Sequence, residues 1–205
     1  MRVIFIHGMG RTPLSMSLLA ARLKFAGYKV GFFTYTVTFE RWNDCVSRLR
    51  NLFQHTSKDD RYCVVAHSLG TVLTRAVIAK IDKKPEACFF LAPPVQACQA
   101  ARQLASRRWF RLMTGEMGQL LANNEFMSTL PIPDMPTVIY SGDGGMTGNY
   151  SPFKDEPNDG ILMVKETLIP GIEVQRSPSL HTFIMNNRQV ANDIIQRLNS
   201  INDSR

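Results

Sequence analysis

Short, uninterrupted apolar runs alternate with amphipathic stretches along almost the whole chain, and this alternation constrains the fold more than any other feature. Residues 3–6 and the run Cys63-Val64-Val65 contain no polar position. A strand that is apolar at every position is buried on both faces, which is typical of a parallel sheet covered by helices. The sequence therefore predicts an α/β fold with a mostly parallel central sheet and helices on both faces.

The predicted elements follow a simple order. Strands are expected at residues 3–6, 28–35, 61–66, 87–91, 137–140 and 171–174. Helices are expected at residues 13–25, 39–53, 69–81 and 183–198. The first helix is expected to bury one stripe of leucines, namely Leu14, Leu18, Leu19 and Leu23. The second is expected to bury an apolar stripe formed by Trp42, Val46, Leu49 and Phe53.

Two segments interrupt this order. Residues 93–136 are basic and partly helical, which predicts a short cap or a pocket-lining insertion. Residues 141–160 are rich in Gly, Asn, Asp and Pro and are expected to form a loop, and long loops in compact domains are often functional. A chain of 205 residues lies within the usual size of one domain. We therefore expect a single domain over residues 1–205.

The composition excludes several classes of protein. No window is long and apolar enough to cross a bilayer, and the N-terminus does not resemble a secretory signal. The four cysteines lack Cys-x-x-Cys spacing, which argues against a zinc site or a dithiol redox pair. A cytoplasmic protein with reduced cysteines, no metal and no cofactor is the expectation.

A net charge of +7 and an isoelectric point near 9.5 are compatible with an anionic partner. The charges are spread along the chain except for one cluster of arginines, which consists of Arg102, Arg107, Arg108 and Arg111. No aromatic-rich nucleic-acid motif accompanies them, so nucleic-acid binding is not expected. Apolar residues lie between these arginines or directly follow them: Leu104, Trp109, Phe110, Leu112 and Met113. Such a segment either makes weak contact with an anionic membrane surface or, as is more common, covers the sheet with its charges in water.

The most informative segment is the predicted strand that runs through Ala66-His67-Ser68-Leu69-Gly70 into a helix. A sharp strand-to-helix turn strains the backbone of the residue at its corner and makes that side chain project, and it requires small neighbours two residues away. Gly70 meets this requirement, and Ala66 stands where a glycine is usual. The helix N-terminus beside Ser68 favours negative charge on a carbonyl under attack. Ser68 is therefore a candidate nucleophile, and the alternative is a small residue in an ordinary turn.

This segment resembles the nucleophile elbow of the α/β-hydrolases, especially small serine esterases akin to lipase class 2 and the inositol-deacylase-like group. Three further segments resemble that group in family order: His7-Gly8-Met9-Gly10-Arg11-Thr12-Pro13, Asn158-Asp159-Gly160-Ile161 and Leu180-His181-Thr182. The first of them resembles the group's oxyanion loop. The resemblance implies an α/β-hydrolase fold and hydrolysis of carboxylic esters.

A serine hydroxyl becomes nucleophilic when a base takes its proton, and histidine is the usual base near neutral pH. His181 follows the last predicted strand, where such enzymes place their base. His67 is adjacent to Ser68 and is expected to leave the corner in another direction. The resemblance implies that His7 shapes the oxyanion loop, and a hydrogen-bonded turn residue is the equal alternative. His55, near a helix C-terminus, is expected to be without function.

In the hydrolase order the acid lies between Ser68 and His181. The candidates after residues 137–140 are Asp143, Asp155, Glu156 and Asp159. Asp143 is nearest the strand end, where many α/β-hydrolases place the acid. Asp159 resembles the Asp-Gly signature of the lipase class 2-like group and is preferred, with Asp143 as the runner-up.

The oxyanion hole is expected to use the backbone amides of Met9 and Leu69, by the family geometry. Gly8 and Gly10 let the first loop approach the substrate closely. The same loop lacks the Lys-Ser/Thr ending of a nucleotide-binding loop and the spacing of a dinucleotide fingerprint.

The sequence hence predicts a serine esterase, lipase-like, that acts through Ser68, Asp159 and His181 and an acyl-enzyme. The same residues would serve a thioesterase, an amidase or an acyltransferase, because fold and triad do not determine the leaving group. A non-catalytic binding protein on a hydrolase scaffold is the alternative from another class.

Overall fold

The computed structural model describes residues 1–59, 61–99, 102 and 105–203. Within them, six strands form one parallel sheet in the order β2-β1-β3-β4-β5-β6. The strands are β1 (Arg2–Ile6), β2 (Lys29–Phe33), β3 (Tyr62–His67), β4 (Cys88–Leu91), β5 (Thr137–Gly142) and β6 (Glu173–Ser177). The prediction of a parallel central sheet is confirmed.

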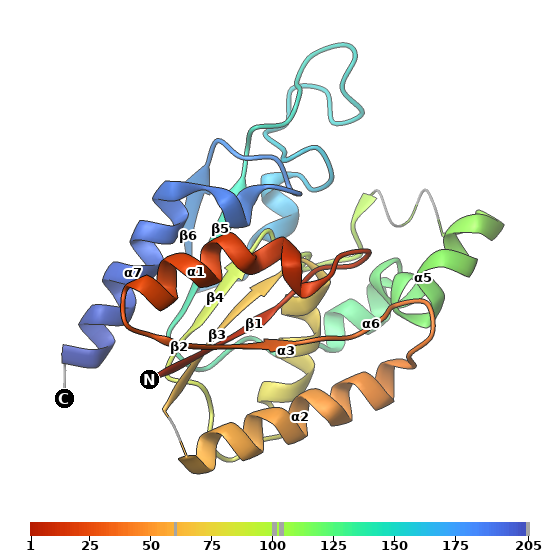
Figure 1. The fold of residues 1–205 in the computed structure, drawn as a ribbon. Coiled ribbons are helices and arrows are strands. Elements are labelled where there is room, and N and C mark those ends of the chain that lie inside the picture. Colours follow the sequence, from red (N-terminus) through yellow and green to blue (C-terminus); the bar gives the residue numbers. More distant parts are fainter. Residues whose placement is uncertain (60, 100–101, 103–104, 204–205) are drawn as a thin grey trace.

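Helices cover both faces of the sheet (Figure 1). One face carries α1 (Ser17–Phe25) and α7 (Arg188–Asp203), and the other carries α2 (Trp42–Asp59) and α3 (Leu69–Ile78). Side chains along β1 alternate between two separate cores because successive residues of a strand point to opposite faces. Val3 and Phe5 pack toward α1 and α7, and Ile4 and Ile6 pack toward α2 and α3.

The predicted helix at residues 13–25 is divided. A 3-10 turn, η1 (Pro13–Met16), precedes α1, and Leu14 and Leu18 are exposed. The buried residues of this region are Met16, Leu19, Ala20 and Leu23. A 3-10 turn advances by a larger angle per residue than an α-helix, so a stripe that begins in it does not continue along the α-helix. The predicted stripe was therefore wrong at Leu14 and Leu18, whereas the stripe in α2 is buried as predicted.

Other boundaries move by a few residues. β6 begins at Glu173 because Gly171, with φ of 78°, and a turn from Ile172 N–H to the Ile169 carbonyl precede it. The predicted last helix is divided into η3 (Ile184–Asn186) and α7.

The segment at residues 93–136 contains α5 (Arg108–Leu121) and α6 (Asn124–Thr129), which lie beyond the carboxyl ends of the strands (Figure 1). The buried Arg75 of α3 anchors the C-terminal part of the 93–136 segment. Its guanidinium donates to the carbonyls of Leu130 and Pro131 at 2.8 and 3.0 Å. Leu104 lies outside the described residues. Within the described residues, no helix is both long and apolar enough to cross a bilayer.

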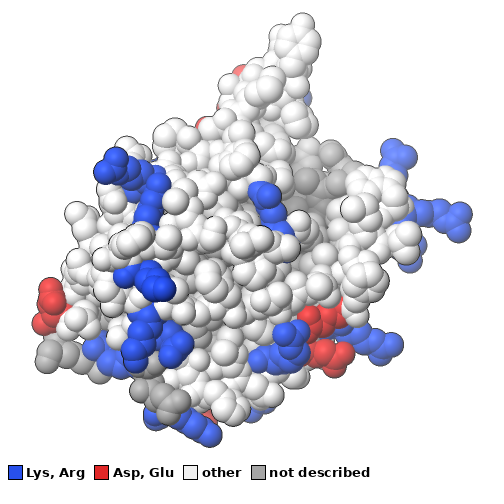
Figure 2. All heavy atoms as spheres, in the orientation of Figure 1, with Lys and Arg blue, Asp and Glu red and all other residues white. Residues whose placement is uncertain are grey.

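The surface carries the excess of basic side chains that the composition requires. On the face shown in Figure 2, Lys and Arg stand in several separate groups, and some project from the side on which Figure 1 places α5. Arg102, Arg107, Arg108 and Arg111 are all exposed. The arginine cluster is thus one basic group among several.

Candidate active site

Ser68 lies at the sharp corner between β3 and α3. Its φ of 49° and ψ of −120° are in a region that residues with a side chain rarely adopt, at a cost of about 1–3 kcal/mol. The backbone N–H of Ser68 donates to the Leu91 carbonyl at 3.0 Å, which ties the corner to β4. A Cβ at Gly70 would lie 2.6 and 2.8 Å from the carbonyl oxygens of Ile6 and His7. The corner therefore requires glycine at position 70, as the elbow motif predicts.

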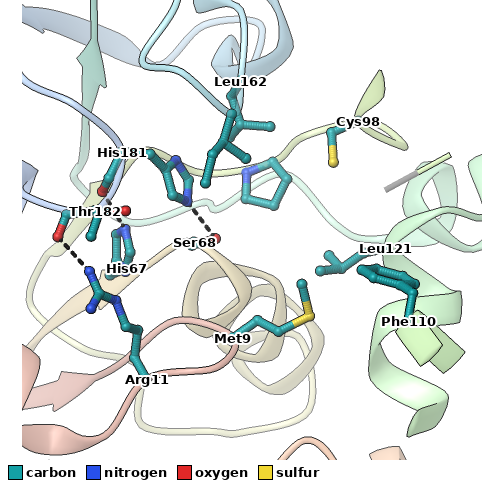
Figure 3. Close-up of a pocket in the computed structure, with 12 residues that line it drawn as sticks. Met9, Arg11, His67, Ser68, Cys98, Phe110, Leu121, Leu162, His181 and Thr182 are labelled. Atoms are coloured by element: carbon teal, nitrogen blue, oxygen red, sulfur yellow. Dashed lines mark hydrogen bonds between the residues drawn. The ribbon is translucent and has the colours of Figure 1, made fainter. Parts of the chain in front are cut away.

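His181 contacts the Ser68 hydroxyl from the loop between β6 and η3 (Figure 3). Its Nε2 lies 3.0 Å from Ser68 Oγ, and its Nδ1 lies 2.7 Å from Asp159 Oδ2. In the neutral ring that this arrangement accommodates, Nδ1–H donates to the carboxylate and Nε2 accepts the serine proton. The structure thus brings together the three residues that the sequence proposed as a triad.

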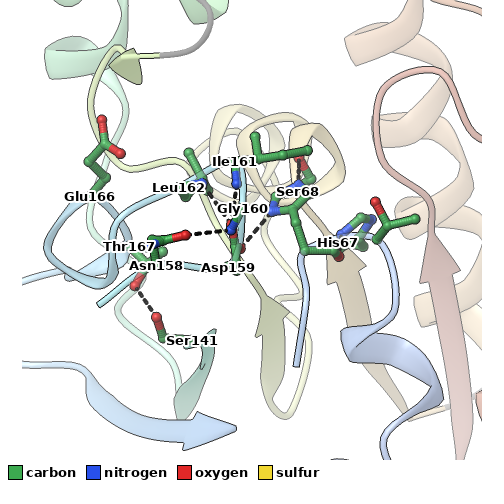
Figure 4. A network of polar contacts seen from close by, with 12 residues as sticks. His67, Ser68, Ser141, Asn158, Asp159, Gly160, Ile161, Leu162, Glu166 and Thr167 are labelled. Carbon is green, nitrogen blue, oxygen red and sulfur yellow. Dashed lines mark hydrogen bonds and ion pairs between the residues drawn. The ribbon is translucent and has the colours of Figure 1, made fainter. Parts of the chain in front are cut away.

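The Asp159 carboxylate is 1% exposed and is held by its own loop (Figure 4). Its Oδ1 accepts hydrogen bonds from the N–H groups of Ile161 and Leu162 at 2.9 and 2.7 Å. The N–H of His181 donates to the Asp159 carbonyl at 2.8 Å. Oδ2 is consequently left to face the imidazole.

Asn158 braces this loop, a role that sequence reasoning missed. Its Nδ2 donates to the carbonyls of Met146 and Glu156, both at 2.9 Å, and its Oδ1 accepts from Gly160 N–H at 2.9 Å. The Asn-Asp-Gly tripeptide is the signal in the sequence, because an Asn side chain of this kind closes a local turn.

Asp143, the second candidate for the acid, does not contact His181. Its carboxylate pairs with Arg176 on β6 at 2.9 Å, and its N–H donates to the Ser177 carbonyl. Glu156 pairs with Lys165 at 2.7 Å. Of the four acidic candidates, Asp159 is the one that the structure brings to His181.

His67 supports His181 from behind, which the sequence did not indicate. The two rings are 4.9 Å apart between centroids, and Nε2–H of His67 donates to the His181 carbonyl at 3.0 Å. Burial, together with the nearby His181 and Arg11, holds the pKa of His67 well below its usual value of 6.5. The ring therefore stays neutral at physiological pH, and it positions the backbone of His181 without adding charge.

His7 stands at the end of β1 and orders the loop that follows. Its Nδ1–H donates to the Gly8 carbonyl at 2.9 Å, and its ring stacks on Tyr35 at 4.3 Å. The Tyr35 hydroxyl donates to the His7 carbonyl at 2.8 Å. Burial lowers the pKa of His7. These contacts fit both readings of the sequence, a loop-shaping residue and a hydrogen-bonded turn residue.

The loop itself approaches Ser68 closely. A Cβ at Gly8 would lie 2.6 Å from His67 Nδ1 and 3.1 Å from Ser68 Cβ. Gly10 has φ of 65°, and Arg11 N–H closes the turn on the Gly8 carbonyl at 3.3 Å. Met9 lies inside this turn and lines the cavity at Ser68. Leu69 is the first residue of α3, where a backbone N–H has no acceptor within the helix.

A cavity of about 280 Å³ opens at Ser68 and is mostly apolar. The 93–136 segment supplies four of its lining residues: Pro94, Cys98, Phe110 and Leu121. Ile161 and Leu162, which directly follow the 141–160 loop, line the cavity too. Arg11 and Thr182 line it as well, and sequence reasoning assigned a role to neither.

His55 lies outside this site. It is exposed near the end of α2, and its Nδ1 bonds to the Asn51 carbonyl at 2.7 Å, one helical turn earlier. This placement agrees with the expectation that the helix simply accommodates it.

No protein-family model matches the chain, and no curated protein sequence matches it. Several solved structures match its fold. The mature form of the Bacillus licheniformis lipase BlEst2 superimposes with a TM-score of 0.72 at 16% identity, over 96% of this chain and 91% of that chain. The RedJ thioesterase of Streptomyces coelicolor has a TM-score of 0.60 at 15% identity, over 98% and 85% of the two chains. An extracellular α/β-hydrolase from a Paenibacillus species has a TM-score of 0.63 at 11% identity, over 96% and 98%. The likenesses span nearly the whole chain, and together with the parallel sheet they show that this protein has the α/β-hydrolase fold.

Proposed function

We propose that the protein is a serine hydrolase that cleaves carboxylic esters, with Ser68 as nucleophile, His181 as base and Asp159 as the acid. One observation carries the proposal: a continuous path of hydrogen bonds runs from Ser68 Oγ through His181 to the buried Asp159, at the wall of an apolar cavity. The lipase and thioesterase that share the fold support this reaction class.

In the first step, Ser68 Oγ attacks the acyl carbon and His181 Nε2 takes the hydroxyl proton. The carbonyl oxygen becomes negative, and the amides of Met9 and Leu69 stabilise it under this proposal. The tetrahedral intermediate then expels the alkoxide, which receives the proton from Nε2, and an acyl-serine remains. Water attacks the acyl-serine with His181 again as base, which releases the acid and restores Ser68.

Asp159 keeps the imidazole in the required tautomer. Because its Oδ2 accepts from Nδ1–H at 2.7 Å, Nε2 faces Ser68 without a proton. The carboxylate also stabilises the imidazolium that forms during attack. A thioester or an amide would pass through the same steps with sulfur or nitrogen as the leaving atom.

A fluorophosphonate probe tests the proposal. We expect one adduct per chain, located on Ser68 by mass spectrometry, together with turnover of 4-nitrophenyl butyrate. Ser68→Ala is expected to lose both, while Ser47→Ala, which alters an exposed serine of α2, keeps both. An unmodified Ser68 beside a labelled control hydrolase would instead favour a non-catalytic binding protein.

We also propose weak contact between α5 and anionic lipid surfaces. Arg107, Arg108 and Arg111 are exposed on this segment, and so are the apolar side chains of Trp109, Leu112 and Met113. Exposed apolar and cationic groups on one helix are the combination that binds a charged interface.

Sedimentation with vesicles measures this contact. We expect binding to vesicles that contain phosphatidylglycerol, loss of binding at high salt, and loss in the triple variant with Gln at positions 107, 108 and 111. A control triple variant replaces Arg41, Arg50 and Arg188, which are exposed elsewhere, with Gln and is expected to bind. Equal sedimentation of both triple variants would contradict the assignment to α5.

A further inference from the structure

Arg11 is a cation at the cavity that opens at Ser68. It is half-buried and lines the same cavity as Ser68 and His181. Its Nη2–H donates to the Thr182 carbonyl at 3.0 Å. No ion pair joins Arg11 to an acidic side chain among the described residues, and Asp159, the acid at this site, faces His181. A guanidinium carries five N–H donors, so most of its bonding capacity remains open.

The two sides of Ser68 differ in chemistry (Figure 3). Phe110, Leu121 and Cys98 lie on one side, and Arg11 lies on the other. Arg11 also lines a second cavity of about 280 Å³, whose wall is mostly apolar but includes Thr36 and Thr38. An ester has two arms that diverge from the reacting carbon, so an apolar arm and a polar arm would find separate surroundings here.

Thr182 indicates which arm meets the cation. It directly follows His181, which under the proposed function gives its proton to the leaving oxygen. Arg11 is bonded to the Thr182 carbonyl, next to His181 in the chain, so the guanidinium would lie near the leaving group as His181 passes it a proton. The acyl arm is then left to the apolar side.

Building on the proposed function, we propose that Arg11 forms an anion subsite, and that the preferred substrates are esters of an apolar acyl group with an alcohol bearing a carboxylate or phosphate. Carboxylates and phosphates accept paired hydrogen bonds from a guanidinium, which a neutral group matches poorly. The net charge of +7 would also draw anionic esters toward the protein.

A matched pair of substrates tests the subsite. One is the hexanoyl ester of 4-(hydroxymethyl)benzoate, and the other is the hexanoyl ester of the neutral 4-(hydroxymethyl)benzamide. We expect wild-type kcat/KM to be at least about tenfold higher for the anionic ester, which is the scale of one hydrogen bond to a charged group. The preference is expected to shrink as salt is added.

Arg11→Gln separates recognition from a structural role. Loss of the bond to Thr182 lowers the turnover of both esters, whereas loss of the subsite removes the preference between them. We expect the ratio of the two kcat/KM values to fall to about one, Arg11→Lys to restore part of it, and the exposed-site control Arg50→Gln to keep it. A ratio unchanged in a folded Arg11→Gln protein would overturn the subsite.

A second pair of substrates tests whether Arg11 recognises the leaving-alcohol arm of the ester and not the acyl arm. Monohexyl glutarate carries the anion on its acyl side, and the hexyl ester of glutaric acid monoamide is its neutral match. We expect no preference that depends on Arg11 in this pair, and a preference larger here than in the first pair would overturn the assignment to the leaving arm.

Cleavage of both benzyl esters without preference rejects the subsite alone. Absence of all turnover with an unlabelled Ser68 rejects the proposed function and the subsite with it.

Discussion

Asp159→Asn is expected to lower kcat about 10⁴-fold, the scale reached when the acid of a Ser-His-Asp triad becomes an amide. The position of the new amide is dictated by the loop. The N–H groups of Ile161 and Leu162 both donate to Oδ1, so the carbonyl oxygen of Asn must stay there. Its NH₂ group would then face His181 Nδ1, which would have to accept a hydrogen bond. The ring proton would move to Nε2, and His181 would no longer take the proton of Ser68.

Asp143→Asn is the matched control, because it makes the same chemical change in a carboxylate that pairs with Arg176. We expect its kcat to stay within about threefold of wild type, since a partly exposed ion pair away from Ser68 and His181 contributes little. Steady-state kinetics on one activated ester, with circular dichroism to verify folding, compares the two variants. The assignment of the acid is wrong if Asp143→Asn abolishes turnover and Asp159→Asn does not.

Gly70→Ala is expected to lower the free energy of unfolding by about 3 kcal/mol and to abolish turnover. The new methyl would lie 2.6 Å from the Ile6 carbonyl oxygen and 2.8 Å from that of His7, and both atoms belong to the backbone. Because neither can rotate away, α3 must separate from β1. That shift would displace Ser68 and the Leu69 amide from the positions that attack and oxyanion stabilisation require.

Urea unfolding measures this effect, with Gly31→Ala as the control glycine. A Cβ at Gly31 would meet only Arg2 Nη1, at 3.9 Å, so this substitution is expected to change stability by less than about 1 kcal/mol. Equal unfolding midpoints for the two variants would show that the corner tolerates a side chain at position 70. Close packing would then not be the reason why this residue is glycine.

Local patterns were enough to predict the layers of the fold. Strands such as β3, which is buried at every position, read as apolar runs, and the stripe of α2 repeats with the helical period. The pattern failed at residues 13–25, where Leu14 is 80% exposed, because a 3-10 turn and an α-helix have different periods. The apolar residues of this segment were compatible with two different buried faces of the helix, and packing against α7 determined which face is buried.

Neighbouring residues also indicated the candidate nucleophile and its base. Ser68 stands between a strand and a helix with Gly70 two residues on, and His181 follows the last strand, so local pattern together with the resemblance to the α/β-hydrolases indicated both. Steric limits at a sharp turn act within a few residues, so they can be predicted from the sequence around the turn.

Contacts between distant parts of the chain were beyond such reasoning. Four acidic residues were compatible with the hydrolase order, and the hydrogen bonds of the Asp159 loop, braced by Asn158, decided which one faces His181. His67 and Arg11 meet carbonyls that are 114 and 171 residues away along the chain. The sequence by itself determined a parallel sheet and a serine at its sharp corner, because those follow from periodicity and local sterics. Only the tertiary structure decided the carboxylate, the lining of the cavity and the cation beside the serine, because each depends on loops that meet only after the sheet has formed.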